Sequence, residues 1–378
     1  MSRRRRTYTI LHTESSRGWG GQERRILSEA GVMRERGHRL IIGADPRGEL
    51  WPRCRQAGFA VVDLAFGGLN NLKAVGSLRQ VYGSAAVDIV NTHSSLDSWI
   101  GLGSMVNPGR RAHHQRPQLI RTRHLTTPIQ GTWPTRLLYQ TPAAVITTGQ
   151  AIKEMIINRA RVPAERIFPI PTGVSLTEFR PVEPRPPLPE SWPPEAYVIG
   201  IVAVLRSWKG HLYLLEALQQ LAAAGEPAYL LIVGDGPYRE VIRDRIQSLG
   251  LGERVWMTGH QEQVADWLAR MDVVVLPSYA NEGVPQALLQ AMAMARPVIG
   301  TSCGGIPEII TPGLNGLLVP PRDPDALARA LQTLRRNPEQ ARDYGRQGLA
   351  RVQANYSLHH MAEAVEAVYD RVLSRENF

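Results

Sequence analysis

Residues 273–300 read VVVLPSYANEGVPQALLQAMAMARPVIG, and this stretch determines the fold class. It opens with an apolar, valine-rich run at Val273–Pro277, which is typical of a buried strand. A loop of turn-forming residues follows, and then a helix-forming run at Gln286–Ala295. A second apolar run lies at Pro297–Thr301. Strand, helix and strand in this order predict a parallel pair joined by a crossover helix.

The same alternation extends outward over the whole chain. Short runs rich in Val and Ile recur, and helical patterns such as Glu23–Arg36 and Gln150–Arg159 lie between most of them. Near-continuous apolar strands that alternate with helices indicate parallel sheets covered on both faces. The other strands are predicted at Tyr8–Thr13, Arg39–Ala44, Ala60–Leu64, Asp88–Thr92, Leu119–Arg123, Ala144–Thr148, Ile167–Pro169, Val198–Leu205, Tyr229–Val233, Val255–Thr258 and Gly316–Val319.

The predicted domain boundaries follow from a change of amino-acid composition in the middle of the chain. Residues 181–195 are rich in proline, which fits neither a helix nor a central strand and predicts a stiff linker. We therefore expect a Rossmann-like domain at 1–180, a second one at 196–357, and a helix at 358–378 that packs back on the first domain. Two doubly wound domains of this kind would face each other across a cleft.

Composition limits the function classes. The chain has 378 residues, enough for two domains, and its 43% hydrophobic and 21% charged content is typical of a folded protein. No apolar run approaches the ~20 residues of a membrane-spanning helix, and no export signal is recognisable, so we expect a cytoplasmic protein. Cys54 and Cys303 form neither a disulfide framework nor a metal-ligand spacing.

The net charge of +10 favours an anionic partner. Basic residues concentrate at Arg3–Arg6 and Arg110–Arg116, and either run is alternatively a solvated tail or loop. Nucleic acid is disfavoured, because neither run is interleaved with aromatic residues and no nucleic-acid-binding motif is found. The second run follows the apolar stretch Trp99–Val106, which suits contact with an anionic membrane at its inner face.

Two cations follow the first predicted strand of the second domain. Arg206 and Lys209 lie in Arg206-Ser207-Trp208-Lys209-Gly210, just before a predicted helix. A point charge, a bidentate guanidinium and a helix N-terminus together suit a diphosphate. The alternative is a solvated loop with two ordinary surface cations.

A carboxylate occupies the loop after the strand at Val273–Pro277. Glu282 can accept hydrogen bonds from sugar hydroxyls, and the N–H groups of Gly283 and Val284 can donate to phosphate or sugar. Gln286 and Gln290 share one face of the following apolar helix, where buried amides need partners. Glu282 is alternatively a carboxylate that caps this helix.

These motifs resemble the family-4 retaining glycosyltransferases of the GT-B fold, which carry an E-x7-E signature. The resemblance covers nearly the whole chain and aligns Glu282 with the first glutamate and Gln290 with the second, so the family's acidic residue for the donor ribose is replaced by an amide. It implies that Arg206 and Lys209 bind the donor diphosphate. Further positions that match family elements are Gly20, Gly21 and Glu23 after the first strand, Gly234 after the second strand of the C-terminal half, and Thr172-Gly173-Val174-Ser175.

Two histidines end predicted strands of the first domain. The resemblance implies that His124 contacts the transferred sugar and is needed for transfer, whereas a structural histidine in a loop is the alternative. His93 and Glu23 are expected on the acceptor side. Asp323 and Asp325 form the only D-x-D pattern, and they are better interpreted as the start of a late helix than as metal ligands.

The sequence therefore predicts a glycosyltransferase that moves a sugar from a nucleotide-diphosphate sugar to a glycan or lipid-linked acceptor in envelope polysaccharide or lipopolysaccharide synthesis. The resemblance implies retention of configuration. We expect no cofactor and no metal, because Arg206, Lys209 and helix N-termini can neutralise the leaving diphosphate. Alternatives are a GT-B epimerase or phosphorylase and a non-catalytic nucleotide-sugar-binding protein. A nicotinamide dehydrogenase is disfavoured because no G-x-G-x-x-G follows the first strand of either half.

Overall fold

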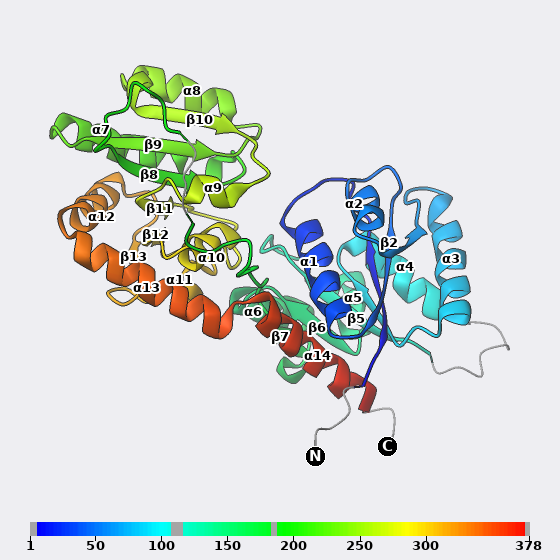
Figure 1. The fold of residues 1–378 in the computed structure, drawn as a ribbon. Coiled ribbons are helices and arrows are strands. Elements are labelled where there is room, and N and C mark those ends of the chain that lie inside the picture. Colours follow the sequence, from blue (N-terminus) through cyan, green and yellow to red (C-terminus); the bar gives the residue numbers. More distant parts are fainter. Residues whose placement is uncertain (1–5, 107–115, 183–186, 375–378) are drawn as a thin grey trace, which may run out of the picture. The chain divides into compact units, whose positions relative to one another are not determined.

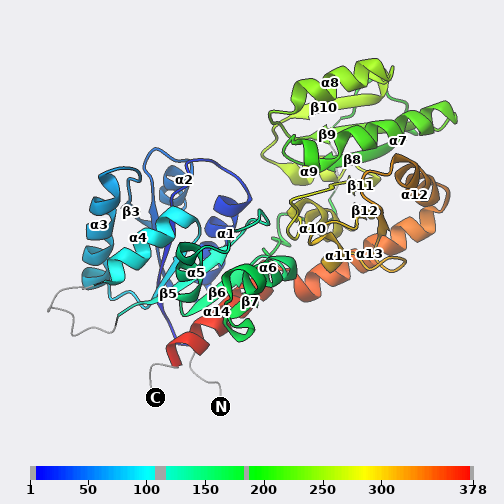
Figure 2. The ribbon, with the colours of Figure 1, turned by 180° about the vertical axis from the view of Figure 1, so that it is seen from behind.

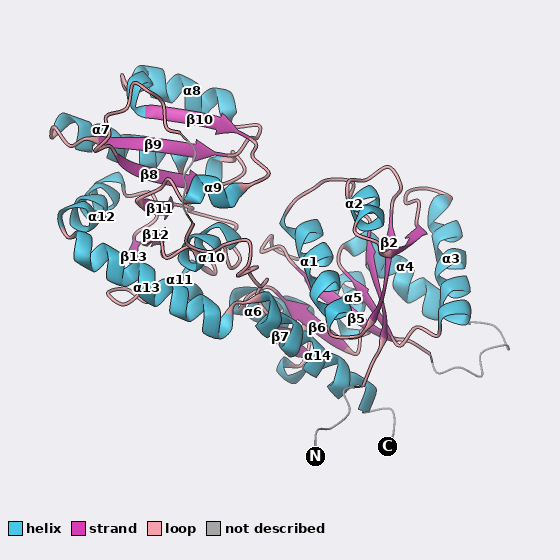
Figure 3. Ribbon diagram, in the orientation of Figure 1, coloured by secondary structure: helices cyan, strands magenta, loops and turns pink. Residues whose placement is uncertain are grey.

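The chain folds into two compact α/β units. The computed structural model describes residues 6–106, 116–182 and 187–374. One unit comprises Met1–Gly173 together with Leu358–Phe378, and the other comprises Val174–Ser357. Each unit is built around one parallel sheet with helices on both faces (Figures 1 and 3). This confirms the predicted fold class of two parallel-sheet domains.

The sheet of the first unit has seven strands in the order β3-β2-β1-β4-β5-β6-β7. All neighbours pair in parallel, and most of the strand residues are buried because helices cover both faces. The strands are β1 (Thr9–Glu14), β2 (Arg39–Ala44), β3 (Ala60–Asp63), β4 (Ile89–Thr92), β5 (Gln118–Arg123), β6 (Ala144–Thr147) and β7 (Ile167–Pro169).

Helices from both ends of the chain cover this sheet. One face packs against α1 (Gly21–Glu35), α2 (Leu50–Gln56) and the C-terminal helix α14 (Leu358–Ser374). The other face packs against α3 (Asn70–Ala85), α4 (Ser95–Met105), α5 (Trp133–Gln140) and α6 (Gln150–Ala160). Helices α3 and α4 lie side by side in both views (Figures 1 and 2). A short 3-10 turn, η1 (Ala164–Arg166), precedes β7.

The sheet of the second unit has six parallel strands in the order β10-β9-β8-β11-β12-β13. They are β8 (Tyr197–Val202), β9 (Ala228–Val233), β10 (Val255–Gly259), β11 (Val273–Leu276), β12 (Val298–Thr301) and β13 (Leu317–Val319). One face packs against α7 (His211–Ala223), α8 (Arg239–Ser248) and α12 (Pro324–Arg336). The other packs against α9 (Val264–Leu268), α10 (Gln286–Ala293), α11 (Ile306–Ile309) and α13 (Pro338–Asn355). The 3-10 turns are η2 (Ser207–Lys209) and η3 (Gly252–Arg254).

In each sheet, successive strands are first added toward one edge and then, from one point on, toward the other edge. In the first unit this point lies between β1 and β4, and in the second between β8 and β11. The helices that follow the two strands lie on opposite faces there, so the loops separate and leave a crevice at the carboxyl ends. These two positions are where ligand-binding residues are expected.

The structure differs from the predicted boundaries in the middle of the chain. Val174 and Phe179 are buried in the core of the second unit, so the chain enters that unit before residue 180. In the proline-rich stretch, Trp192 is buried there as well, and its indole N–H donates to the carbonyl of Glu253 at 3.1 Å. The described part of 181–195 therefore packs on the second unit, because apolar side chains stand among its prolines; residues 183–186 lie outside the described ranges.

Three further predictions can be compared with the structure: a strand boundary, the two basic runs and the absence of a membrane-spanning helix. The strand predicted at Val198–Leu205 was too long: β8 ends at Val202, although the Leu205 N–H still donates to the Asp235 carbonyl of the segment after β9 at 3.0 Å. Most of the basic run Arg110–Arg116 and of Arg3–Arg6 lies outside the described residues. In the described part of the chain, no helix is long and apolar enough to span a bilayer.

Candidate active site

An ion pair between two of the predicted residues lies where β8 and β11 of the second unit end. Lys209 lies in η2 after β8, and Glu282 lies in the loop after β11. The Lys209 Nζ donates to Glu282 Oε1 at 2.5 Å, and the Ser278 hydroxyl donates to the same oxygen at 2.6 Å. Glu282 is 4% exposed, so its charge depends on these two donors.

Close backbone packing fixes the two loops that carry this ion pair. The Tyr279 N–H donates to the Trp208 carbonyl at 2.9 Å, which ties the Glu282 loop to η2. Gly210 has φ of 78°, and a Cβ there would lie 2.0 Å from the Pro277 carbonyl oxygen. On the other side Gly304, with φ of 54°, packs as closely on the Glu282 carbonyl. Only glycine fits either position, which explains why the motif is rich in glycine.

Glu282 does not cap the following helix. The N-cap of α10 is Pro285, and no side chain accepts a hydrogen bond there. Glu282 instead receives Lys209 and Ser278, which removes the capping interpretation. Within the described residues, the backbone N–H groups of Gly283 and Val284 make no hydrogen bond, so both are available as donors.

In the described part of the chain, the side chains of the other predicted donor-binding residues of this unit make no hydrogen bond or salt bridge with the ion pair. Arg206 is exposed, and its guanidinium lies 5.6 Å from the Trp208 ring centroid. Gly234, with φ of 139°, packs against the Ala203 carbonyl at the end of β8. Gln290 is half-buried on α10, and its side chain makes no hydrogen bond among the described residues.

Two further residues of the second unit have defined roles, His211 at the start of α7 and Asp323 at the start of α12. Burial and the Lys209 charge lower the pKa of His211, the first residue of α7, to about 4, so this imidazole is neutral at pH 7. Asp323 accepts from the Ala326 N–H at 2.8 Å and caps α12, which confirms its interpretation as a helix start.

In the first unit, the glycine turn after β1 begins α1. Gly20 is the N-cap, and its N–H donates to Glu23 Oε2 at 2.8 Å, which is the half of a capping box that a glycine N-cap can form. Glu23 is buried by this contact. Its side chain thus holds the turn formed by Gly20 and Gly21.

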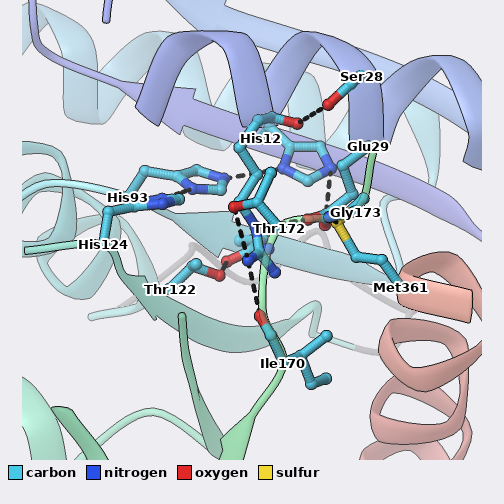
Figure 4. Close-up of polar contacts among 12 residues, drawn as sticks. His12, Ser28, Glu29, His93, Thr122, His124, Ile170, Thr172, Gly173 and Met361 are labelled. Carbon is cyan, nitrogen blue, oxygen red and sulfur yellow. Dashed lines mark hydrogen bonds and ion pairs between the residues drawn. The ribbon is translucent and has the colours of Figure 1, made fainter. Parts of the chain in front are cut away.

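Three histidines stand in a row across β1, β4 and β5 (Figure 4). His12 Nδ1 and His93 Nε2 are 2.9 Å apart, and His93 Nδ1 and His124 Nε2 are 2.8 Å apart. His12 and His93 are buried and His124 is half-buried. Burial lowers the pKa of all three, and that of His93 and His124 falls well below the usual value. The structure therefore brings the two predicted histidines into contact and adds a third.

Two buried carboxyls beside this row were missed by the sequence reasoning. Asp97 accepts from the His93 N–H at 2.8 Å and from Thr13 at 2.9 Å, which fixes the loop after β4. Burial raises its pKa. Burial and the Asp97 charge also raise the pKa of Glu14 to about 8, so this carboxyl is largely protonated at pH 7. The signal available in the sequence was their position at a strand end or in the first turn of a helix.

Within residues 6–106, 116–182 and 187–374, no three His, Cys, Asp or Glu side chains are arranged to hold a metal ion. This includes the histidine row, whose nitrogens face one another.

Comparison with known proteins agrees with the domain architecture. Residues 19–178 match the family model described as Glycosyltransferase Family 4, and residues 196–337 match that described as Glycosyl transferases group 1. The chain belongs to these two-domain glycosyltransferases. This confirms the predicted membership of glycosyltransferase family 4, while the retaining mechanism and the E-x7-E alignment stay predictions.

Individual relatives of this glycosyltransferase family match over shorter stretches. Alpha-D-kanosaminyltransferase of Streptomyces kanamyceticus is 28% identical over 66% of this chain and 65% of its own length. A lipopolysaccharide core biosynthesis mannosyltransferase, LpcC of Rhizobium leguminosarum bv. viciae, is 27% identical over 53% of this chain and 58% of its own length. The chain thus spans less than two thirds of either relative. The crystal structure of a glycosyltransferase from Rickettsia africae has a TM-score of 0.85 at 21% identity, with 97% of this chain and 99% of that one covered, and shares the fold.

Proposed function

We propose that this glycosyltransferase moves a sugar from a nucleotide-diphosphate sugar to a glycan or lipid-linked acceptor, with retention of anomeric configuration. The observation that carries the proposal is the ion pair between Lys209 and the buried Glu282 at the crevice of the second unit. A cation and a hydrogen-bond acceptor on adjacent loops suit the two halves of such a donor, its phosphates and its sugar hydroxyls.

Lys209 and Arg206 are proposed to bind the diphosphate. The ammonium is a point charge, and the exposed guanidinium can hold two oxygens. The N-terminus of α7, a helix of 13 residues that begins directly after Lys209, adds the partial positive charge of its free N–H groups. These groups can neutralise the leaving diphosphate, so we propose transfer without a metal ion or cofactor.

Glu282 is proposed to accept hydrogen bonds from the donor sugar. The free N–H groups of Gly283 and Val284 donate to the sugar or to the phosphate next to it. Gln290 would take the ribose hydroxyls with its amide, and Gly234 is proposed to hold the loop after β9 against the Ala203 carbonyl so that the donor can approach this backbone. Because an amide replaces a carboxylate at Gln290, the ribose contact loses its charge.

The residues of the first unit are proposed to serve transfer and the acceptor. His124 contacts the transferred sugar, and His93 holds His124 at 2.8 Å. Gly20 and Gly21 form the turn beside the substrates, with Glu23 fixing that turn rather than binding the acceptor itself. The leaving phosphate oxygen and the attacking hydroxyl then lie on the same face of the sugar.

We also propose an acceptor of the envelope-polysaccharide type and a site of action at the cytoplasmic face of the membrane. A net charge of +10 supports attraction to anionic lipid, and Trp99 and Val106 are 38% and 67% exposed at α4. At low salt the protein should co-sediment with vesicles that contain anionic lipid and stay in solution with neutral vesicles. Failure to co-sediment with the anionic vesicles would remove this part of the proposal.

The experiment that tests the main proposal is a saturation-transfer NMR screen of UDP-, GDP-, ADP- and CMP-sugars, with and without EDTA. One class of donor should bind in both conditions. Binding only without EDTA would contradict the metal-independent part. Turnover of the donor without any acceptor would favour an epimerase, release of a sugar phosphate would favour a phosphorylase, and binding without any turnover would favour a non-catalytic protein.

A further inference from the structure

The histidine row of the first unit has an in-line geometry. The ring centroids of His12 and His93 are 5.2 Å apart, and those of His93 and His124 are 5.1 Å apart. The bonded nitrogens are 2.9 and 2.8 Å apart. For these nitrogen–nitrogen distances, the centroids of two imidazole rings are farthest apart when both nitrogens lie on the line between the centroids, and the observed separations have this maximum value. The nitrogens therefore lie on the lines that join the rings, and each hydrogen bond lies close to the ring planes.

Each contact in this row holds one proton. A neutral imidazole has one N–H and one lone pair, so the row can be ordered in only two directions. At its buried end, His12 Nε2 lies 4.0 Å from Glu29 Oε1, and Glu29 Oε2 receives the Arg25 Nε at 3.3 Å. A carboxylate beside Nε2 favours an N–H there over a lone pair.

Glu29 thereby sets the direction of the whole row. With the proton of His12 on Nε2, its Nδ1 accepts from the Nε2–H of His93. The Nδ1 of His93 then accepts from the Nε2–H of His124, and a lone pair is left on His124 Nδ1. His124 is the half-buried member, so the row presents a proton acceptor at its more exposed end.

We propose that this row is a proton relay, with His124 Nδ1 as the acceptor and His12 beside Glu29 as the place where the proton is stored. A proton taken up at His124 Nδ1 displaces the Nε2 proton to His93 Nδ1. The Nε2 proton of His93 then passes to His12 Nδ1. His12 ends with two N–H groups and a positive charge next to Glu29, while His93 and His124 stay neutral with their tautomers reversed.

The charges around the row agree with this direction. Burial is the main cause that lowers the pKa of His93 and His124 well below the usual value, and the other imidazoles of the row and the nearby arginines Arg25 and Arg121 add to it. The pKa of His12 is lowered less strongly, because Glu29 opposes burial. Of the three imidazoles, His12 is thus the one that best tolerates the positive charge.

Glu29 is buried at the His12 end of the row, and a tyrosine packs beside it. Tyr369 of α14 is fully buried beside it, and burial followed by the Glu29 charge raises the Tyr369 pKa well above its usual value. The tyrosine therefore stays protonated and does not compete for the relayed proton. Figure 4 shows Glu29 and the row extending from α1 toward β5.

In transfer, the relay would take the proton that the acceptor hydroxyl loses when its oxygen bonds to the anomeric carbon. This use rests on the proposed function, whereas the direction of the row does not. His124 is the group at the reacting atoms, and His12, His93 and Glu29 act through it as positioning residues.

The first test uses the substrate-free protein. Imidazole ¹⁵N NMR at neutral pH, with signals assigned by His12→Gln, His93→Gln and His124→Gln, should show all three rings protonated on Nε2 only. A proton on Nδ1 of His124, or two protons on any of the three, would overturn the relay. This result is independent of whether a donor is ever found.

The second test follows the pH dependence of transfer. In Glu29→Gln the positive charge on His12 loses the carboxylate that stabilises it, so the pKa of the row falls. The acidic limb of the kcat profile should therefore move to lower pH by about one unit or more. His93→Gln should lower kcat by about 10²-fold with the donor KM unchanged. His38→Gln removes a buried histidine outside the row and should leave the limb in place.

The outcomes separate the two proposals. An unmoved limb in Glu29→Gln, with the variant folded, would overturn the relay while leaving the glycosyltransferase proposal intact. Absence of transfer in the wild type would overturn the proposed function, and the NMR result would still decide the direction of the row.

Discussion

Replacing Lys209 by alanine is expected to weaken binding of the nucleotide-sugar donor by about 10- to 100-fold and to lower transfer by about 10²- to 10³-fold. A hydrogen bond to a charged group contributes about 1.5–3 kcal/mol, and loss of a group that stabilises developing charge costs about 10²–10³ in rate. Calorimetric titration of the donor and steady-state kinetics measure the two effects. Lys73→Ala removes an exposed lysine of α3 and should change neither.

The ion pair with Glu282 requires a second comparison. In Lys209→Ala the Glu282 carboxylate keeps only the Ser278 hydroxyl at 2.6 Å, and some of the loss could arise from this stranded charge. Glu282→Gln and the double variant complete a mutant cycle. If Lys209 served only to hold Glu282, donor affinity in the double variant would equal that in Glu282→Gln. Donor affinity and rate within twofold of wild type in a folded Lys209→Ala would contradict the proposed site.

The fold, and the placement of Lys209 and Glu282 in loops that follow strands of the second unit, could be predicted because both depend on local pattern. Apolar runs rich in β-branched residues identified every strand that the structure contains, and only their ends differ. The contact between Lys209 and Glu282 was not predicted, because it depends on the strand order: carboxyl ends of neighbouring parallel strands share an edge of the sheet. β8 and β11 are such neighbours.

The histidine row could not be predicted in the same way. His12 lies inside β1, where the apolar pattern gives no reason to single it out, and it meets His93 only through the register that places His12 beside Asn91 of β4. Glu29 lies on α1 and reaches the row only because that helix packs on the same face as His12. Contacts that depend on strand register and helix rotation leave no local signal in one sequence.

The proline-rich stretch shows the opposite error, a local pattern that was given too much weight. Prolines exclude regular structure, but they do not exclude packing. Trp192, placed 4.9 Å from the Tyr229 ring, belongs to the core of the second unit. An apolar aromatic residue within the run was the signal that this segment is attached rather than free.

Replacing Arg25 by leucine is expected to destabilise the first unit by about 3–5 kcal/mol, because it strands a buried carboxylate. Arg25 and Glu29 are both fully buried on α1, and the Arg25 Nη1 also donates to the Ile170 carbonyl at 2.7 Å. Hydrogen exchange followed by mass spectrometry on peptides from β1 and β4 measures the opening free energy of this unit separately from the other. Arg24→Leu, at the neighbouring exposed position, should change it by about 0.5 kcal/mol or less.

The double variant Arg25→Leu, Glu29→Leu distinguishes a stranded charge from lost packing. If the cost comes from the unpaired Glu29, removal of that carboxylate should recover most of the stability, since apolar replacement of a whole buried ion pair is often neutral. Stability in the double variant no higher than in Arg25→Leu would instead assign the cost to the lost contact with Ile170. The double variant could recover its stability and yet lose the acidic limb of the kcat profile. This result would show that the Arg25–Glu29 pair serves to orient the histidine row and does not stabilise the fold.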